Sequence, residues 1–374
     1  MHYEFSEQEQ QLITEAGRMA GLETAKTTGT DLEDPIKMRE LMGKLAMILN
    51  PTGYMAAGLK DDTPLTAATM AAMEAVAGAA PKVFIPFEIS NRVFGRLINR
   101  YGNPGQKQEY LTALQKGSLT GTVAISETAL NVVNDPLTTR GVSGADGVTV
   151  NGEKGFVVGA DTVDVLAVVG VLDDGLGVYL VDRQMPGVTV KKVEVVTEFA
   201  PLHIGSVGLE NCKVPRDRIL GPVNQEQLLA DLRLWENQVL IAAAVGMMGA
   251  TLFTATAYAK EHRSGGRPVI AYQEVGFKLA EMLTLTQTAQ LMAYKAAWLA
   301  ESGDREATVF TDCAKVFCAE SAEETAGSAL RVMSAAGMKP DNNADIAYRY
   351  AKFIQIAGTS TEIARVRIGD AMLK

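Results

Sequence analysis

The sequence predicts an α+β fold in which a block of strands separates two blocks of helices. Residues 1–119 show mainly helical periodicity, residues 120–224 form short β-branched runs between Gly or Asp-Gly turns, and residues 225–374 return to helical periodicity. Because the elements come in blocks rather than alternating, a parallel doubly wound sheet is not expected. We therefore expect an N-terminal helical domain, a middle antiparallel β-domain and a C-terminal four-helix bundle with these bounds.

The first block carries recognisable helix signals. Ser6 followed three residues later by Glu9 has the pattern of a capping box. The stretch DDTPLTAATMAAMEAVAGAA has helical periodicity with small residues at its contact positions. A further apolar run, IPFEISNRVFGRLINRYG, is expected to form a helix that ends at Gly102. These signals predict several consecutive helices up to about residue 119.

The middle and last blocks differ in period and composition. The runs GTVAIS, GVTVNGEKGFVVG, DVLAVVGVL, GVYLVD and GVTVKKVEVV alternate or are rich in Val, as strands are. After Gln225 come four long segments rich in Ala, Gly and Met with few charges. Such segments are typical of a tightly packed helical bundle that also buries a subunit interface.

Composition excludes several classes of function. The net charge of −9 offers no electrostatic reason to expect nucleic acid or an anionic membrane surface. The most apolar stretch, residues 239–252, is shorter than a membrane span, and the acidic N-terminus lacks the apolar core of a signal peptide. Three cysteines and three scattered histidines predict neither a disulfide framework nor a metal site. We expect a cytoplasmic protein without a metal.

Familiar nucleotide motifs are also absent from the sequence. No G-x-G-x-x-G follows a predicted strand and no G-x-x-x-x-G-K-[ST] is present. Rossmann-type dinucleotide binding and P-loop chemistry therefore have no support.

Five local motifs, in order along the chain, resemble the acyl-CoA dehydrogenase family. The motifs are YGNPGQKQEYLTALQKGSLTGTVAISE, VNGEKGFVVGAD, LENCKVPRDRILG, YAKEHRSGGRPVIAYQEVGFKLAEM and YRYAKFIQIAGTSTEIARV. The resemblance implies FAD as cofactor, an acyl-CoA as substrate and an electron-transferring flavoprotein as electron acceptor. It also implies a homotetramer or an α2β2 hetero-oligomer.

The resemblance assigns cofactor contacts to individual residues. Ser126 stands at the Thr of a family Thr-Glu pair, and Phe156-Val157-Val158 replaces an aromatic-x-Thr segment, keeping the aromatic wall and losing a hydroxyl at Val158. Residues 129–135 replace a small-residue and Ser-Asp pattern. The resemblance also implies that Arg263, Arg267 and Gln273 face the FAD of a partner subunit. Arg331 stands at the first position of a family Gln-x-x-Gly-Gly motif and would place a cation near the phosphates. Gly358 and Thr359 are the implied contacts in the closing turn.

The closing turn, Ala357-Gly358-Thr359-Ser360, lacks the glutamate that most family members have there. In some branches the base lies instead at the start of the first C-terminal helix, which corresponds to Glu236. Glu236 is the last acidic residue before 24 residues without another, on a helix whose apolar face must be buried, so a raised pKa is expected. Solvation at a helix N-terminus is the alternative interpretation. Glu88, on the helix expected to line the acyl pocket, is a second candidate base.

Three functions follow from these observations. The first is FAD-dependent α,β-dehydrogenation of a branched, cyclic or otherwise unusual acyl-CoA with Glu236 as base. The second is a catalytically silent or half-active subunit of a hetero-oligomeric acyl-CoA dehydrogenase, which the replaced family residues favour. The third is a binding protein that keeps an acyl or CoA pocket without redox chemistry.

Overall fold

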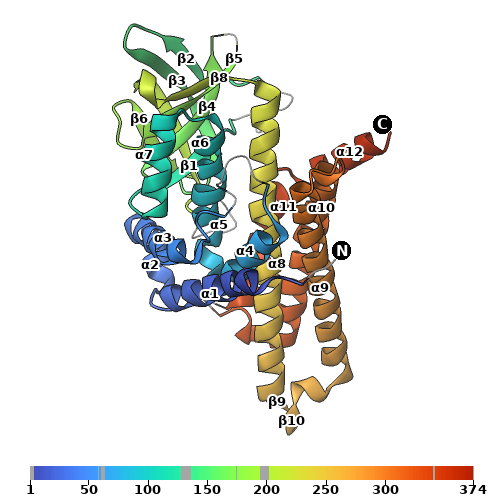
Figure 1. Ribbon diagram of the computed structural model, residues 1–374. Helices are drawn as coiled ribbons and strands as arrows, with labels where there is room; N and C mark the ends of the chain where they lie inside the picture. The colour runs from blue at the N-terminus through green and yellow to red at the C-terminus, as the bar shows by residue number, and fades with distance from the viewer. Residues whose placement is uncertain are drawn as a thin grey trace. The chain divides into compact units, whose positions relative to one another are not determined.

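Contacts within the chain divide it into two units in the computed structural model, which describes residues 4–57, 59, 64–127, 136–173, 175–193, 202–339 and 342–373. Unit 1 comprises residues 1–29, 63–85 and 236–374, and unit 2 comprises residues 30–62 and 86–235. The division crosses two helices, α5 (Pro81–Glu88) and α8 (Gln225–Glu261) (Figure 1). The division into three domains read from the sequence stays a prediction.

Unit 2 contains the β-sheet and the helices around it. Its strands are β1 (Gly121–Ala124), β2 (Arg140–Ser143), β3 (Gly147–Val157), β4 (Val165–Leu172), β5 (Gly175–Asp182), β6 (Val188–Lys192), β7 (Gly205–Pro215) and β8 (Ile219–Val223). Its helical segments are α2 (Gly29–Glu33), α3 (Pro35–Leu49), η1 (Asn50–Thr52), the π-helix η2 (Ile89–Phe94), α6 (Gly95–Tyr101), α7 (Pro104–Gln115) and η3 (Arg216–Arg218).

The strands form one sheet in the order β6-β7-β3-β2-β4-β5-β8, with β1 paired to β4. Most pairs are antiparallel, as predicted, but β1 and β2 run parallel to β4. The parallel pairs arise because the chain leaves through β3 before it returns along β4 in the original direction. The core of this sheet is built from apolar side chains such as Val150, Val168 and Tyr179.

Unit 1 is helical. It contains α1 (Glu7–Thr24), α4 (Ala67–Ala79), α8 from Glu236 onward, α9 (Gln273–Glu301), α10 (Ala307–Met333), η5 (Ser334–Ala336), α11 (Asn343–Ile356) and α12 (Thr361–Met372), with the short β9 (Arg263–Ser264) and β10 (Arg267–Pro268) and η4 (Val269–Ala271) between α8 and α9. The last of the four helical segments expected after Gln225 is thus two helices, α11 and α12. Figure 1 shows α10 beside α9 and α11.

Local signals explain where several elements begin. The predicted capping box is present, because Ser6 Oγ accepts a hydrogen bond from the Glu9 N–H and Glu9 Oε2 accepts one from the Ser6 N–H. Helix α4 packs against α8 at backbone distance, since a Cβ on Gly246 would lie 2.4 Å from the Glu74 carbonyl oxygen. Small residues in these helices therefore serve close helix packing. The predicted order of helices, strands and helices is confirmed.

Helix α8 is long and apolar enough to cross a membrane by length and composition, with a mean hydropathy of 1.8 over its most apolar window. However, 67% of that window is buried inside the protein. This is the pattern of a core helix, whose apolar side chains are buried against the rest of the protein.

Candidate active site

The closing turn between α11 and α12 is small because α8 packs directly against it. Gly358 has a left-handed backbone with φ +64, and a Cβ there would lie 2.7 Å from Asn237 Oδ1 and 3.4 Å from Glu236 Cγ. Ser360 then caps α12 by accepting a hydrogen bond from the Ile363 N–H. The turn is thereby held next to the start of the α8 segment in unit 1.

Asn237 fastens the turn through two hydrogen bonds to one residue. Its Oδ1 accepts from the Thr359 N–H at 3.0 Å, and its Nδ2 donates to Thr359 Oγ1 at 3.1 Å. Both residues are buried. These two bonds tie both the backbone and the hydroxyl of Thr359 to α8.

Lys315 of α10 fastens the same turn from another side. Its fully buried Nζ donates to the carbonyl oxygens of Ile354, Ala357 and Thr359 at 2.5, 3.2 and 3.1 Å. Burial lowers the pKa of Lys315 to about 8, and the negative charge of Glu236 is the largest influence in the opposite direction. A buried cation is therefore hydrogen-bonded to the backbone of the turn.

Glu236 lies on the partly buried face of α8 that meets this turn. Burial raises the pKa of Glu236, whereas the positive charge of Lys315 and a hydrogen bond from the Gly358 backbone N–H lower it. The raised pKa agrees with the direction predicted from the sequence. The structure thus brings Glu236, Gly358 and Thr359 together, so a carboxylate from α8 stands beside the turn that lacks one.

Glu88 has a different environment, in unit 2. Its Oε1 accepts a hydrogen bond from the Tyr54 hydroxyl at 2.7 Å, and its Oε2 lies 3.2 Å from Arg92 Nε. Arg92 also donates to the backbone carbonyls of Tyr54 and Ala57. Burial raises the pKa of Glu88, which its two partners oppose. The completely buried Glu88 side chain is therefore part of an internal polar cluster.

The predicted flavin-facing residues lie close together in unit 2. Among the described residues, the Ser126 hydroxyl has no hydrogen-bond partner, and its carbonyl accepts from the Gly155 N–H. The Phe156 ring is 47% exposed at the end of β3, and the Val158 carbonyl accepts from the Thr122 hydroxyl. A free hydroxyl beside an exposed aromatic ring suits the acceptor atoms and the flat face of a flavin. Residues 129–135 lie outside the described residues.

A buried ion pair supports this segment, and sequence reasoning did not single it out. Lys154 Nζ lies 2.7 Å from Glu127 Oε1 and donates to the Ile125 carbonyl at 3.1 Å. The Glu127 carboxylate also accepts from the Thr138 N–H and hydroxyl and from the Thr139 N–H. Burial alone would raise the pKa of Glu127, but these donors lower it to about 2. The pair holds the residues on both sides of Ser126.

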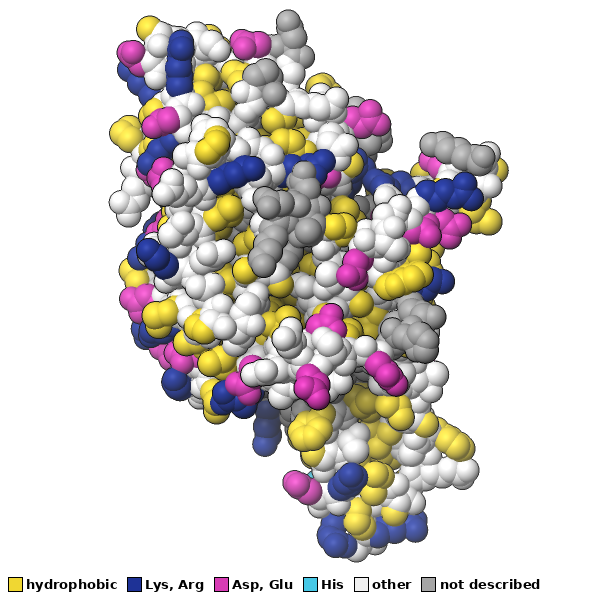
Figure 2. Space-filling view, viewed as in Figure 1, with side chains coloured by type: hydrophobic (Ala, Val, Ile, Leu, Met, Phe, Trp, Pro, Cys, Tyr) yellow, Lys and Arg dark blue, Asp and Glu magenta, His cyan; other side chains and the backbone are white. Residues whose placement is uncertain are grey.

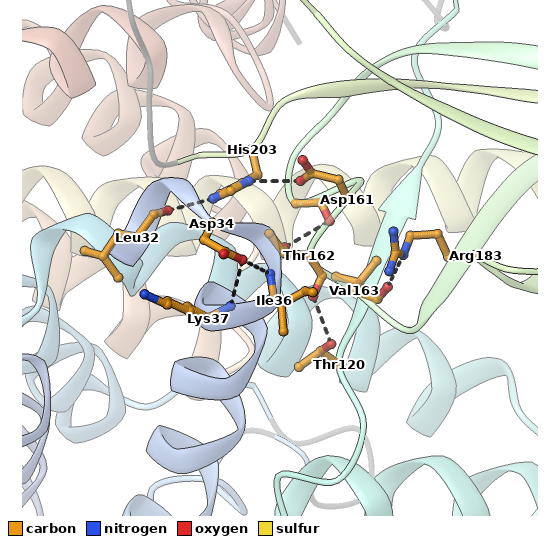
Figure 3. A network of polar contacts seen from close by, with 11 residues as sticks. Leu32, Asp34, Ile36, Lys37, Thr120, Asp161, Thr162, Val163, Arg183 and His203 are labelled. Atoms are coloured by element: carbon orange, nitrogen blue, oxygen red, sulfur yellow. Dashed lines mark hydrogen bonds and ion pairs between the residues drawn. The ribbon is translucent and has the colours of Figure 1, made fainter. Parts of the chain in front are cut away.

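A second support follows Val158 directly. Figure 3 shows the His203 ring between two acceptors: Nδ1 lies 3.0 Å from Asp161 Oδ1, and Nε2 lies 2.8 Å from the Leu32 carbonyl oxygen. The His203 carbonyl accepts from the Ala160 N–H. His203 adopts a left-handed backbone with φ +50, which aims its ring between these groups. The contacts fix the backbone that follows the flavin-facing segment.

The predicted partner-facing residues gather at the tip of the β9–β10 hairpin in unit 1. Arg263 and Arg267 are exposed, and Gln273 is exposed at the start of α9. The Arg267 guanidinium lies 4.4 Å from the centre of the Tyr272 ring. Figure 2 shows Lys and Arg side chains at this end of the molecule. Two exposed guanidinium groups and an amide fit the charge and hydrogen-bonding needs of a pyrophosphate.

Arg331, by contrast, is engaged on its own helix. Its guanidinium lies 3.0 Å from Glu324 Oε1 and donates to the Ser328 hydroxyl at 2.8 Å. The side chain is exposed, so the ion pair is weak.

Two further observations limit the search for other sites. A cavity of about 420 Å³ in unit 2 is lined by α3, the end of α7 and Asp164, and includes none of the predicted site residues. Within the part of the chain that the structure describes, no cluster of His, Cys, Asp and Glu could hold a metal ion.

Comparisons with known proteins agree with the predicted resemblance. A family model described as acyl-CoA dehydrogenase, C-terminal domain, matches residues 233–373. The 3-(aryl)acrylate reductase of Clostridium sporogenes is 28% identical over 90% of this chain and 90% of its own length. A probable acyl-CoA dehydrogenase, YngJ of Bacillus subtilis, is 28% identical over 91% of each chain.

Solved structures show the same fold. Butyryl-CoA dehydrogenase from Megasphaera elsdenii superposes with a TM-score of 0.88 at 22% identity, covering 100% of both chains. Other solved structures of this fold include complexes with FAD. The family model matches residues 233–373 and the relatives span nine-tenths of the sequence, so this chain is similar to acyl-CoA dehydrogenases over nearly its whole length.

Proposed function

We propose that the chain catalyses the FAD-dependent α,β-dehydrogenation of an acyl-CoA thioester, with Glu236 as the base that removes the α-proton. The observation that carries this proposal is the position of the Glu236 side chain beside the closing turn, next to Gly358. A base for a weakly acidic α-carbon needs a raised pKa, because a more basic carboxylate accepts the proton more readily. Burial supplies that raised pKa here.

The residues around Glu236 keep the carboxylate usable. The Gly358 N–H favours its ionised form, which is the form that accepts a proton. When bound, FAD supplies the acceptor for the β-hydride. Ser126, Phe156 and Val158 would hold the flavin ring, while Arg263, Arg267 and Gln273 would bind the phosphates of a partner subunit's FAD. Gly358 and Thr359 contribute through the backbone of the turn.

We further propose that the substrate is a branched, cyclic or otherwise unusual acyl-CoA and that electrons pass to an electron-transferring flavoprotein. The lack of the usual glutamate at Ala357 or Gly358 of the turn and the use of α8 for the base support this choice of substrate. A cytoplasmic homotetramer or α2β2 hetero-oligomer is proposed for the assembly. Exposed apolar side chains on α8 and α9 support burial against another subunit, namely Phe253, Phe277, Leu283 and Leu291.

A second candidate is a catalytically silent subunit that lends Arg263 and Arg267 to a homologous partner. Val158 in place of a hydroxyl residue favours it, because this replacement removes an expected cofactor contact. The absorption spectrum of the purified chain distinguishes the two functions. Stoichiometric flavin absorbance supports the enzyme, whereas a colourless chain that gains flavin only with a co-purified homologue supports the silent subunit.

The role of Glu236 is tested by anaerobic bleaching of the flavin. Butyryl-CoA, isovaleryl-CoA and cyclohexanecarbonyl-CoA serve as straight, branched and cyclic probes. The Glu236→Gln variant should bind the probe and lose bleaching by about 10²-fold or more, because general-base catalysis contributes about that much. Glu226→Gln is the matched control, since Glu226 is exposed on the same helix. Bleaching of the Glu236 variant at the parental rate would disprove the assignment.

A further inference from the structure

Lys315 is a buried cation for which the proposed chemistry has no direct use. Its three N–H donors match three carbonyl oxygens, all from the end of α11 and the closing turn. The carbonyl end of a helix carries partial negative charge, so an ammonium group is favoured there. Hydrogen bonding alone would explain why a donor occupies this position. It does not explain why the donor is charged, because a neutral donor would avoid the cost of burying a charge.

The acidic groups near Lys315 explain why the donor is a cation. Those that raise the pKa of Lys315 are the carboxylates of Glu236 on α8, Asp312 on α10 and Glu362 on α12, with Glu236 the strongest. Burial raises the pKa of the neighbouring Cys318 thiol, which therefore stays neutral. Asp312 already pairs with Arg367 at 2.9 Å, and Glu362 is exposed to solvent. The Lys315 charge therefore acts mainly on Glu236, and this action is reciprocal because Lys315 is also the main charge that lowers the Glu236 pKa.

We propose that Lys315 is a positioning residue that holds the closing turn against α8 and keeps the Glu236 carboxylate ionised for proton removal. This inference rests on the proposed role of Glu236 as the base. Without the cation, burial of Glu236 would favour its protonated form, which cannot accept the α-proton. The same side chain thus sets both the position of the turn and the charge of its neighbour.

Three variants of the FAD-loaded enzyme separate these contributions. Lys315→Met removes the charge and all donors, Lys315→Gln removes the charge and keeps an amide donor, and Lys315→Arg keeps the charge. The measurement is the pH dependence of flavin bleaching by whichever of the three acyl-CoA probes reacts fastest with the parent. The parental rate should fall as the pH drops through the titration of Glu236.

The two neutral variants should move this fall in rate upward by about 1–2 pH units, since an opposite charge nearby typically shifts a carboxyl group by that amount. Lys315→Arg should leave the fall in place. A purely structural lysine would give a different result: both neutral variants would lose thermal stability while the fall in rate stayed at the parental pH. That result would overturn the proposal. If the Met variant does not fold, the Gln variant alone is compared with the parent.

Glu236→Gln separates failure of this inference from failure of the proposed function. If that variant bleaches flavin normally, Glu236 is not the base and Lys315 has no base to position. If it does not bleach while the neutral Lys315 variants show no pH shift, the base assignment stands and only the role of Lys315 is wrong.

Discussion

Replacing Lys154 with Met should destabilise unit 2 by about 3 kcal/mol, because it leaves the buried Glu127 carboxylate without its cation. The Lys154 side chain is fully buried, and its Nζ lies 2.7 Å from Glu127 Oε1. Met has a similar length and no charge, so the substitution removes the ion pair with little change in volume.

The magnitude follows from the two pKa shifts. The pKa of Glu127 falls from 4.5 to about 2, which corresponds to about 3 kcal/mol in favour of the folded state at roughly 1.4 kcal/mol per pH unit. Burial lowers the pKa of Lys154, so burying its ammonium offsets part of this gain. Breaking a buried pair from one side costs about 3–5 kcal/mol. The donors from Thr138 and Thr139 remain and place this case at the lower end.

The assay is urea denaturation of the parent and the variant at pH 7 and pH 3. Because the folded pKa of Glu127 is depressed, its contribution is complete above the unfolded value of 4.5 and is lost as the pH falls towards about 2. The deficit of the Met variant should therefore shrink at pH 3. The double variant Lys154→Met with Glu127→Gln should recover part of the loss. A single-variant loss below about 0.5 kcal/mol, or a double variant no more stable than the single, would refute the reasoning.

Two further predictions concern the turn and the internal cluster. Gly358→Ala should lower the free energy of unfolding by about 2–3 kcal/mol, from about 1–2 for the left-handed backbone and about 1 for a disturbed Asn237 hydrogen bond, measured by urea denaturation. Unchanged stability would contradict the close approach of α8. Tyr54→Phe should cost about 1–3 kcal/mol through the lost hydrogen bond to Glu88 and leave the bleaching rate unchanged. A rate that falls in that variant would restore Glu88 as a candidate base.

Local and periodic features were predictable from the sequence. The capping box of Ser6 and Glu9 depends on residues three apart, and the change of period near residue 120 depends on alternation within short runs, so both are visible in the chain itself. The parallel pairing of β1 and β2 with β4 was not predicted, because strand direction depends on contacts between distant segments.

The same distinction applies to the candidate site. The family resemblance pointed to Glu236, its isolation before a long apolar stretch supported that choice, and the structure places Gly358 beside it. Lys315 had a comparable signal, a single cation in the apolar run CAKVFCAE, yet its partners come from residues about 40 positions away. Glu88 looked similar in sequence, but its partners Tyr54 and Arg92 account for its charge.

The packing of Asn237 against Gly358 also limits how this enzyme could change over evolutionary time. A glutamate introduced at position 358 would need a left-handed backbone, and its Cβ would meet Asn237 Oδ1 at 2.7 Å. Placing a carboxylate at position 358 would therefore require a second change on α8 that removes the bonds holding Thr359. Because the first of these two changes alone gives a protein that folds poorly, we expect position 358 to stay glycine for as long as Asn237 holds the turn.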